Sequence, residues 1–158
     1  MLELIERLAA DGEVADSVSL PYDLRQKCRQ RVRLDSGRDA AIVLPPGTPL
    51  LSGERLRAAD GTTVRINAAS EAVTIGRTDD PVLLARACYH LGNRHVALQV
   101  GRGWVRYQPD HVLDDMVRGL GLAVSYESAP FDPERGAYDV NSRHRHHQGE
   151  GASHGHRN

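Results

Sequence analysis

The chain has 158 residues, and its 20 basic and 21 acidic side chains leave a formal net charge of -1. A charge this balanced gives no reason to expect nucleic acid or an anionic membrane as the main partner. No apolar run approaches the roughly 18–20 residues that span a bilayer, so the sequence predicts no membrane-spanning helix.

The start of the chain and the two cysteines both indicate the cytoplasm. Acidic residues such as Glu3 and Glu6 interrupt the first segment, which lacks the basic and continuous apolar parts of a signal peptide. Cys28 and Cys88 lie far apart and form no CxxC pair. Neither a disulfide framework nor a cysteine-based zinc site is therefore expected, and we predict a cytoplasmic protein.

Residues 1–75 show a pattern of strands and turns. Residues 31–34 and 64–67 alternate polar and apolar side chains, as half-buried strands do, and residues 40–44 form a short apolar run. Turn sequences rich in Asp, Ser and Gly separate these runs, at residues 35–37, 52–53 and 59–61. The sequence predicts an all-β module here.

From residue 71 onward the pattern becomes β-α-β-β-α-β. The expected elements, in chain order, are a strand at 71–77, a helix from Pro81 to the Gly92-Asn93 pair, strands at 96–100 and 104–107, a helix opened by Pro109 and closed by Gly119 and Gly121, and a strand at 122–127. Two helices that cover one face of a four-stranded antiparallel sheet form the ferredoxin-like arrangement. The predicted fold class is α+β.

Residues 143–158 contain no large hydrophobic residue, so we predict a flexible tail. Five of the eight histidines lie there, at His144, His146, His147, His154 and His156. Neutral imidazole binds nickel, copper and zinc well, and a flexible segment can wrap several rings around one ion. Arg, Gln, Gly and Glu interrupt these histidines, whereas an affinity tag is usually uninterrupted, so a native metal-collecting tail is predicted.

The other three histidines, His90, His95 and His111, belong to the folded second half. His90 and His95 would lie about 140° apart around a continued helix, because five residues turn about 500°. One chain therefore offers no compact chelate. In a two-fold symmetric dimer, however, a histidine near the axis meets its own copy, which gives a two-histidine site with positions left open for tail imidazoles or water.

Enzyme chemistry is not predicted. Cys88 and His90 could suggest a thiol nucleophile, but Cys88 falls on the apolar face of its helix, where a buried thiol is inert. Asp114 and Asp115 point about 100° apart on a helix, which predicts a solvated acidic face rather than a pair that shares a proton. Because the chain has no P-loop sequence, nucleotide hydrolysis is assigned to a partner.

The segment CYHLGNRH at residues 88–95, followed by Gln99 and by DHVL at 110–113, resembles the signature of the UreE family of urease accessory nickel chaperones. The resemblance covers essentially the whole chain. It implies a β-rich, peptide-binding-like domain at 1–75, a ferredoxin-like metal-binding and dimerisation domain at 76–142, and a flexible His-rich tail at 143–158.

The resemblance also implies a role for each histidine. His95 would be the principal ligand of Ni(II), bridging the ion with its partner copy, and the tail histidines would complete or supplement the site. His111 and His90 match secondary and auxiliary metal positions. Pro109 stands where some relatives carry a further histidine, which lowers the weight of His111. Ni(II) would be transported cargo, and the same ligands also suit zinc and copper.

The implied partners are a second copy of the chain, the urease apoprotein and the urease accessory GTPase complex. Two functions stay open. In the first, the protein is a metallochaperone that delivers nickel for assembly of the urease active site. In the second, it is an interaction scaffold of a maturation complex, whose β-rich half binds a client peptide while the tail only buffers metal. Substitution of His95 discriminates between them.

Overall fold

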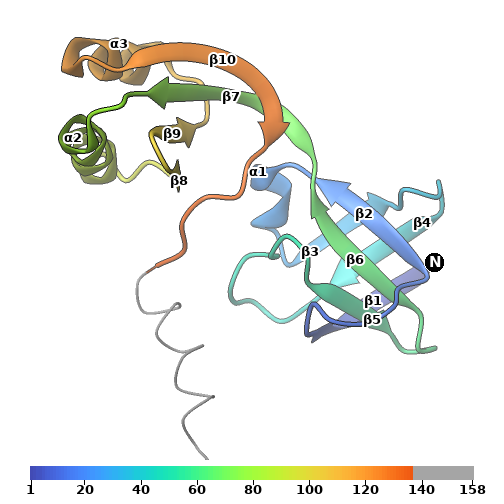
Figure 1. The fold of residues 1–158 in the computed structure, drawn as a ribbon. Helices are drawn as coiled ribbons and strands as arrows, with labels where there is room; N and C mark the ends of the chain where they lie inside the picture. The colour runs from blue at the N-terminus through green and yellow to red at the C-terminus, as the bar shows by residue number, and fades with distance from the viewer. Residues whose placement is uncertain (137–158) are drawn as a thin grey trace, which may run out of the picture.

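The computed structural model describes residues 1–136, so the predicted tail and its five histidines lie outside the described residues. The described part contains two β-sheets with separate hydrophobic cores and three helices, which confirms the α+β class (Figure 1). No helix within residues 1–136 is long and apolar enough to cross a membrane.

The first sheet has six strands in the order β2-β6-β5-β1-β4-β3. Their bounds are β1 (Leu2–Leu8), β2 (Asp16–Leu20), β3 (Arg29–Arg33), β4 (Asp39–Val43), β5 (Arg55–Ala58) and β6 (Thr63–Ala68), and the short helix α1 (Tyr22–Arg25) links β2 to β3. The β1–β4 and β2–β6 pairs are parallel, and the others are antiparallel. Alternate side chains such as Leu4, Ile42 and Ile66 are fully buried in one cluster, as the period of two requires.

Asp35 joins the two edge strands of this sheet. Its backbone N–H donates to the Ser17 carbonyl at 2.8 Å, and its carboxylate accepts from the hydroxyls of Ser17 at 2.5 Å and Ser19 at 3.1 Å. Asp16 accepts from the Ser36 hydroxyl, and this bond is the main cause that lowers the pKa of Asp16. The first sheet therefore curls into a near-barrel that covers its own core.

The second sheet has four strands in the order β10-β7-β9-β8. Its elements are β7 (Ser70–Arg77), α2 (Pro81–Asn93), β8 (Gln99–Gly101), β9 (Trp104–Tyr107), α3 (His111–Leu120) and β10 (Ala123–Pro130), which confirms the predicted β-α-β-β-α-β order. Both helices pack on one face, where a side chain at Gly76 would come within 3.0 Å of Val117. The predicted division at residue 75 falls within β7, and the domain bounds stay a prediction.

Aspartates begin both helices of the second half. The Asp80 carboxylate accepts from the Val82 N–H at 2.8 Å. The second helix begins at His111 rather than at Pro109, because the Asp110 carboxylate caps it and accepts from the Val112 N–H at 2.9 Å.

The chain that follows β10 covers the other face of the second sheet. We call residues 131–134 the strap. Phe131 is fully buried against Val73 and Ile75 of β7. The Glu134 N–H then donates to the carbonyl of Leu98, just before β8, at 2.6 Å. The strap thus crosses from the edge strand β10 to the opposite edge strand β8, passing between β8 and α1 in Figure 1.

Candidate metal centre

His95 lies just beyond α2 with a left-handed backbone, at φ 57°. Within residues 1–136 it is the only residue other than glycine with a positive φ. The His95 N–H donates to the Gly92 carbonyl at 3.0 Å and the Val96 N–H to the Leu91 carbonyl at 3.4 Å, the Schellman pattern that usually places glycine here. The chain therefore turns at His95, two residues after Asn93, and the prediction that the Gly92-Asn93 pair ends the helix is confirmed.

A left-handed conformation costs a non-glycine residue about 1–2 kcal/mol. Backbone strain of this kind concentrates at functional sites. The His95 side chain is exposed, and it stands at the C-terminal end of α2, where the helix dipole is negative. Both features favour a cation bound to this imidazole.

The structure does not bring the other two folded histidines into a cluster with His95. His90 is exposed on the last turns of α2 and packs edge-on against the Tyr89 ring, with centroids 5.3 Å apart. His111 is exposed at the start of α3. Across residues 1–136, no three His, Cys, Asp or Glu side chains lie close enough to hold a metal ion. Residues 1–136 of one chain therefore supply no group of three ligands for a metal ion.

The outer surfaces of α2 and α3 carry exposed apolar side chains. Val82 and Tyr89 on α2 are 54% and 66% exposed, and Val112 on α3 is 49% exposed. Val82 and Tyr89 are seven residues apart, so they lie on the same face of the helix that ends at His95. Large exposed apolar side chains close to each other are a feature of protein interfaces.

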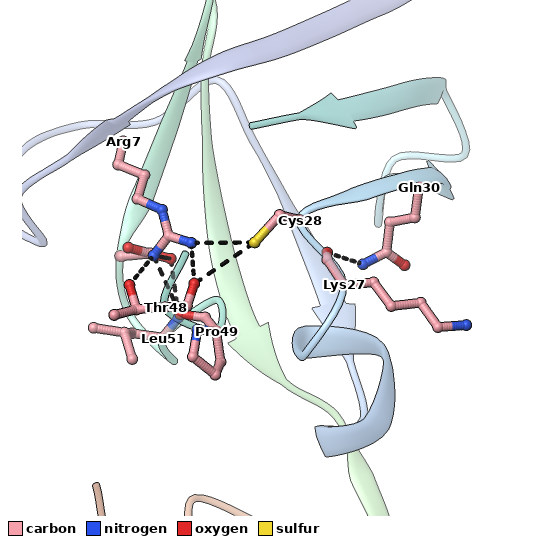
Figure 2. Close-up of polar contacts among 8 residues, drawn as sticks. Arg7, Lys27, Cys28, Gln30, Thr48, Pro49 and Leu51 are labelled. Carbon is pink, nitrogen blue, oxygen red and sulfur yellow. Dashed lines mark hydrogen bonds and ion pairs between the residues drawn. The ribbon is translucent and has the colours of Figure 1, made fainter. Parts of the chain in front are cut away.

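Both cysteines are free, and they lie in different halves of the chain. Cys88 is half-buried, and burial first and the charge of Glu134 second raise the pKa of its thiol, which keeps the thiol protonated near neutral pH. Cys28 lies in the first half, where its sulfur is 3.8 Å from the Arg7 guanidinium and 3.7 Å from the Thr48 carbonyl (Figure 2). Arg7 also donates to the Pro49 carbonyl at 3.2 Å, so this cluster ties a loop to β1.

Asp114 corrects the prediction of a solvated acidic face. Its carboxylate is buried and accepts from the hydroxyls of Tyr107 and Tyr126, both at 2.8 Å. Burial is the main cause that raises the pKa of Tyr107, and the hydrogen bond from its hydroxyl to Asp114 is the second. Asp115 is exposed and pairs with Arg118 at 3.2 Å, so the prediction holds for Asp115 alone. Helical spacing beside buried positions could have indicated the burial of Asp114.

Two sequence models of one family match the chain. The model described as UreE urease accessory protein, N-terminal domain, matches residues 1–69, and the model of the C-terminal domain matches residues 71–157. The chain belongs to the UreE family. The resemblance seen in the motif around His95 is thereby confirmed. UreE proteins are non-enzymatic chaperones that take part in urease maturation, and membership implies the handling of nickel.

Relatives described as urease accessory protein UreE are similar over most of their length. The protein of Alkalilimnicola ehrlichii is 56% identical over 138 residues, which cover 87% of this chain and 85% of that protein. The protein of Citrobacter koseri is 49% identical over 150 residues, covering 94% of this chain and 98% of its own. Both UreE domains therefore have counterparts in these relatives.

Proposed function

We propose that this UreE family member is a cytoplasmic nickel metallochaperone that delivers Ni(II) for assembly of the urease active site. The observation that carries the proposal is the exposed His95 ring on strained backbone at the negative end of α2. Imidazole is a suitable ligand for nickel, and it also suits zinc and copper. Because the His95 side chain is exposed, packing gives little reason for a histidine on this strained backbone, whereas metal binding does.

A homodimer would supply the second ligand. Because one chain presents no cluster of three ligands within residues 1–136, His95 needs a second source of donor atoms. A two-fold axis near His95 pairs it with its own copy, and the apolar side chains Val82 and Tyr89 on the same helix would be covered. The remaining coordination positions stay open, which allows the ion to be released.

The tail histidines would complete or supplement this site. The bond from Glu134 to Leu98 brings the chain back to within three residues of His95, at most about 11 Å along an extended backbone. His144 follows Glu134 by ten residues and can reach about 35 Å from it. The whole set of His144, His146, His147, His154 and His156 then serves as a collecting arm, with His90 and His111 as auxiliary ligands.

Nickel titration tests the proposal. In a full chain whose five tail histidines are glutamine, which we call the tail-glutamine chain, about one ion per two chains is expected, as a site on a two-fold axis requires. His95→Ala should abolish this binding. His111→Ala removes only a proposed auxiliary ligand and should leave this stoichiometry unchanged. Unchanged stoichiometry in His95→Ala would remove the centre of the proposal.

Delivery is tested in cells that activate urease at limiting nickel. His95→Ala should lower urease activity more than the loss of the tail histidines does, because the tail adds capacity to a site that His95 creates. The proposed recipients are the urease apoprotein and the accessory GTPase complex. If His95→Ala leaves activation unchanged, the alternative scaffold function, with a metal-buffering tail, is the better account.

A further inference from the structure

The second half of the chain holds the strap through Gln99. The Gln99 side-chain oxygen accepts from the Asp132 N–H at 3.1 Å and from the Arg106 guanidinium at 3.3 Å. Arg106 also donates to the Pro130 carbonyl at 3.1 Å. Gln99 belongs to the sequence motif that begins before His95, yet it is no candidate metal ligand. Its contacts give it a different role, which is to hold the chain that leaves β10.

The first half of the chain holds the same strap through α1. The buried Arg25 guanidinium donates to the Phe131 carbonyl and to the Leu20 carbonyl, and it lies 3.7 Å from the Asp132 carboxylate. The Tyr22 ring meets the Phe131 ring edge-on, with centroids 5.3 Å apart.

Contacts on several sides fix the position of Arg25. A buried guanidinium is expensive unless its donors are satisfied, and carbonyls and one carboxylate satisfy them here. The Arg25 carbonyl in turn accepts from the Leu50 N–H at 2.7 Å, in the loop that Arg7 ties to β1. A cavity of about 360 Å³ lies between this loop and the strap. On the side that faces the loop, the strap is therefore held by individual contacts such as those of Arg25 and not by continuous packing.

We propose that Gln99 and Arg25 are positioning residues that hold the strap and thereby keep Glu134, from which the chain continues toward the His-rich tail, beside the segment that joins His95 to β8. The first half of the molecule then sets the effective concentration of tail imidazoles at the metal centre. The part of this inference that concerns metal rests on the proposed function, whereas the part that concerns the strap does not.

The size of the effect follows from chain geometry. A released tail would start at Pro130 on β10, three strand spacings or about 14 Å farther across the sheet. His144 would then be 14 residues from its root instead of the ten that separate it from Glu134. For a flexible chain, the longer segment and the larger distance together lower the effective concentration at His95 about threefold.

Nickel affinity in matched chains tests the metal part. Gln99→Leu and Arg25→Gln should each weaken nickel binding of the full chain, by up to about threefold, and leave the tail-glutamine chain unchanged, since only the former has tail imidazoles to position. Gln99→Glu, which keeps the acceptor for the Asp132 N–H, should restore the full-chain affinity. Gln108→Leu is the control, because it removes the 3.1 Å bond to Asp23 of α1 without touching the strap.

Amide hydrogen exchange in the metal-free full chain tests the strap part. Gln99→Leu and Arg25→Gln should speed exchange at Asp132 and Glu134, and Gln108→Leu should not. Unchanged exchange in both variants overturns the inference. Equal weakening of nickel binding in the full and tail-glutamine chains also overturns it, because the effect would then be general. If His95→Ala retains nickel, the proposed function fails and exchange alone decides this inference.

Discussion

The two sheets of this protein solve the burial of a core in different ways. The first curls until Asp35 joins its edge strands, so one closed layer covers one core. The second is open and has apolar residues on both faces, with α2 and α3 on one and the strap with Tyr22 on the other. The first sheet covers its core by itself. In the half that carries His95, one face of the sheet is covered by the strap and by Tyr22 of the first half. Substitutions in the strap should therefore affect the half of the molecule that carries the proposed metal centre.

The largest effect is expected from Phe131→Ala, since the side chain is fully buried under the open face of the second sheet. Loss of a buried aromatic ring should lower the free energy of unfolding by about 3–5 kcal/mol. Residue-resolved hydrogen exchange should show faster exchange at Val73 and Ile75 and unchanged exchange in the first sheet. The comparison of the two halves fails if both sheets lose protection equally. Leu56→Ala, in the first core, is the reciprocal control.

A smaller effect is expected on the helix-covered face. Asp114→Ala leaves the hydroxyls of Tyr107 and Tyr126 without their acceptor, which should lower the free energy of unfolding by about 1–3 kcal/mol. Asp115→Ala, one residue along the same helix, should change it by less than about 0.5 kcal/mol. Denaturant unfolding of the two variants measures the difference. Equal effects would contradict the burial of Asp114.

His95→Gly should stabilise the nickel-free protein by about 1 kcal/mol, because glycine adopts the left-handed conformation without strain. His95→Ala removes the same imidazole but retains a Cβ, so it should bring no such gain. Thermal unfolding without metal compares the two variants, and both should fail to bind nickel at the proposed site. A glycine variant no more stable than the alanine variant would show that the turn is unstrained.

The smallest effect concerns the closure of the first sheet. The pKa of Asp16 is lowered from 3.8 in the folded protein, chiefly by the Ser36 hydroxyl, so its stabilisation is present above pH 3.8 and lost as the pH falls through the folded value. Ser36→Ala should therefore destabilise the protein at neutral pH, and the difference should vanish in strong acid. Unfolding at several pH values measures this. A difference that persists below the folded pKa would exclude titration of Asp16 as its cause.

Much of the fold was predictable from residue patterns. Period-two runs indicated β3 and β6, a short apolar run indicated β4, and capping residues with helical spacing indicated α2 and α3. Three strands, β1, β2 and β5, were missed. In β1 a bulge between Leu4 and Glu6 breaks the alternation. In β5 the four residues Arg55–Ala58 do alternate, so this strand was overlooked although its pattern is present in the sequence. Their positions depend on partners distant in sequence.

The candidate site was predictable only as a set of residues. The motif named His95, His90 and His111, but not the left-handed turn at His95. Nor did it indicate the strap, because Phe131 is a single hydrophobic residue in a polar stretch. Its holders are remote, since Gln99 lies 33 residues from Asp132 and Arg25 lies 106 residues from Phe131. Contacts of this range are set by folding and leave no local pattern.

The left-handed turn at His95 has a consequence for how this chain changes over generations. Folding alone favours replacement of His95 by glycine, so only the use of its imidazole opposes that replacement. If His95 binds metal as proposed, a lineage that no longer needs the metal can replace this residue by glycine and gain stability. A histidine retained at this position therefore indicates that its imidazole is used, because the fold alone does not require it.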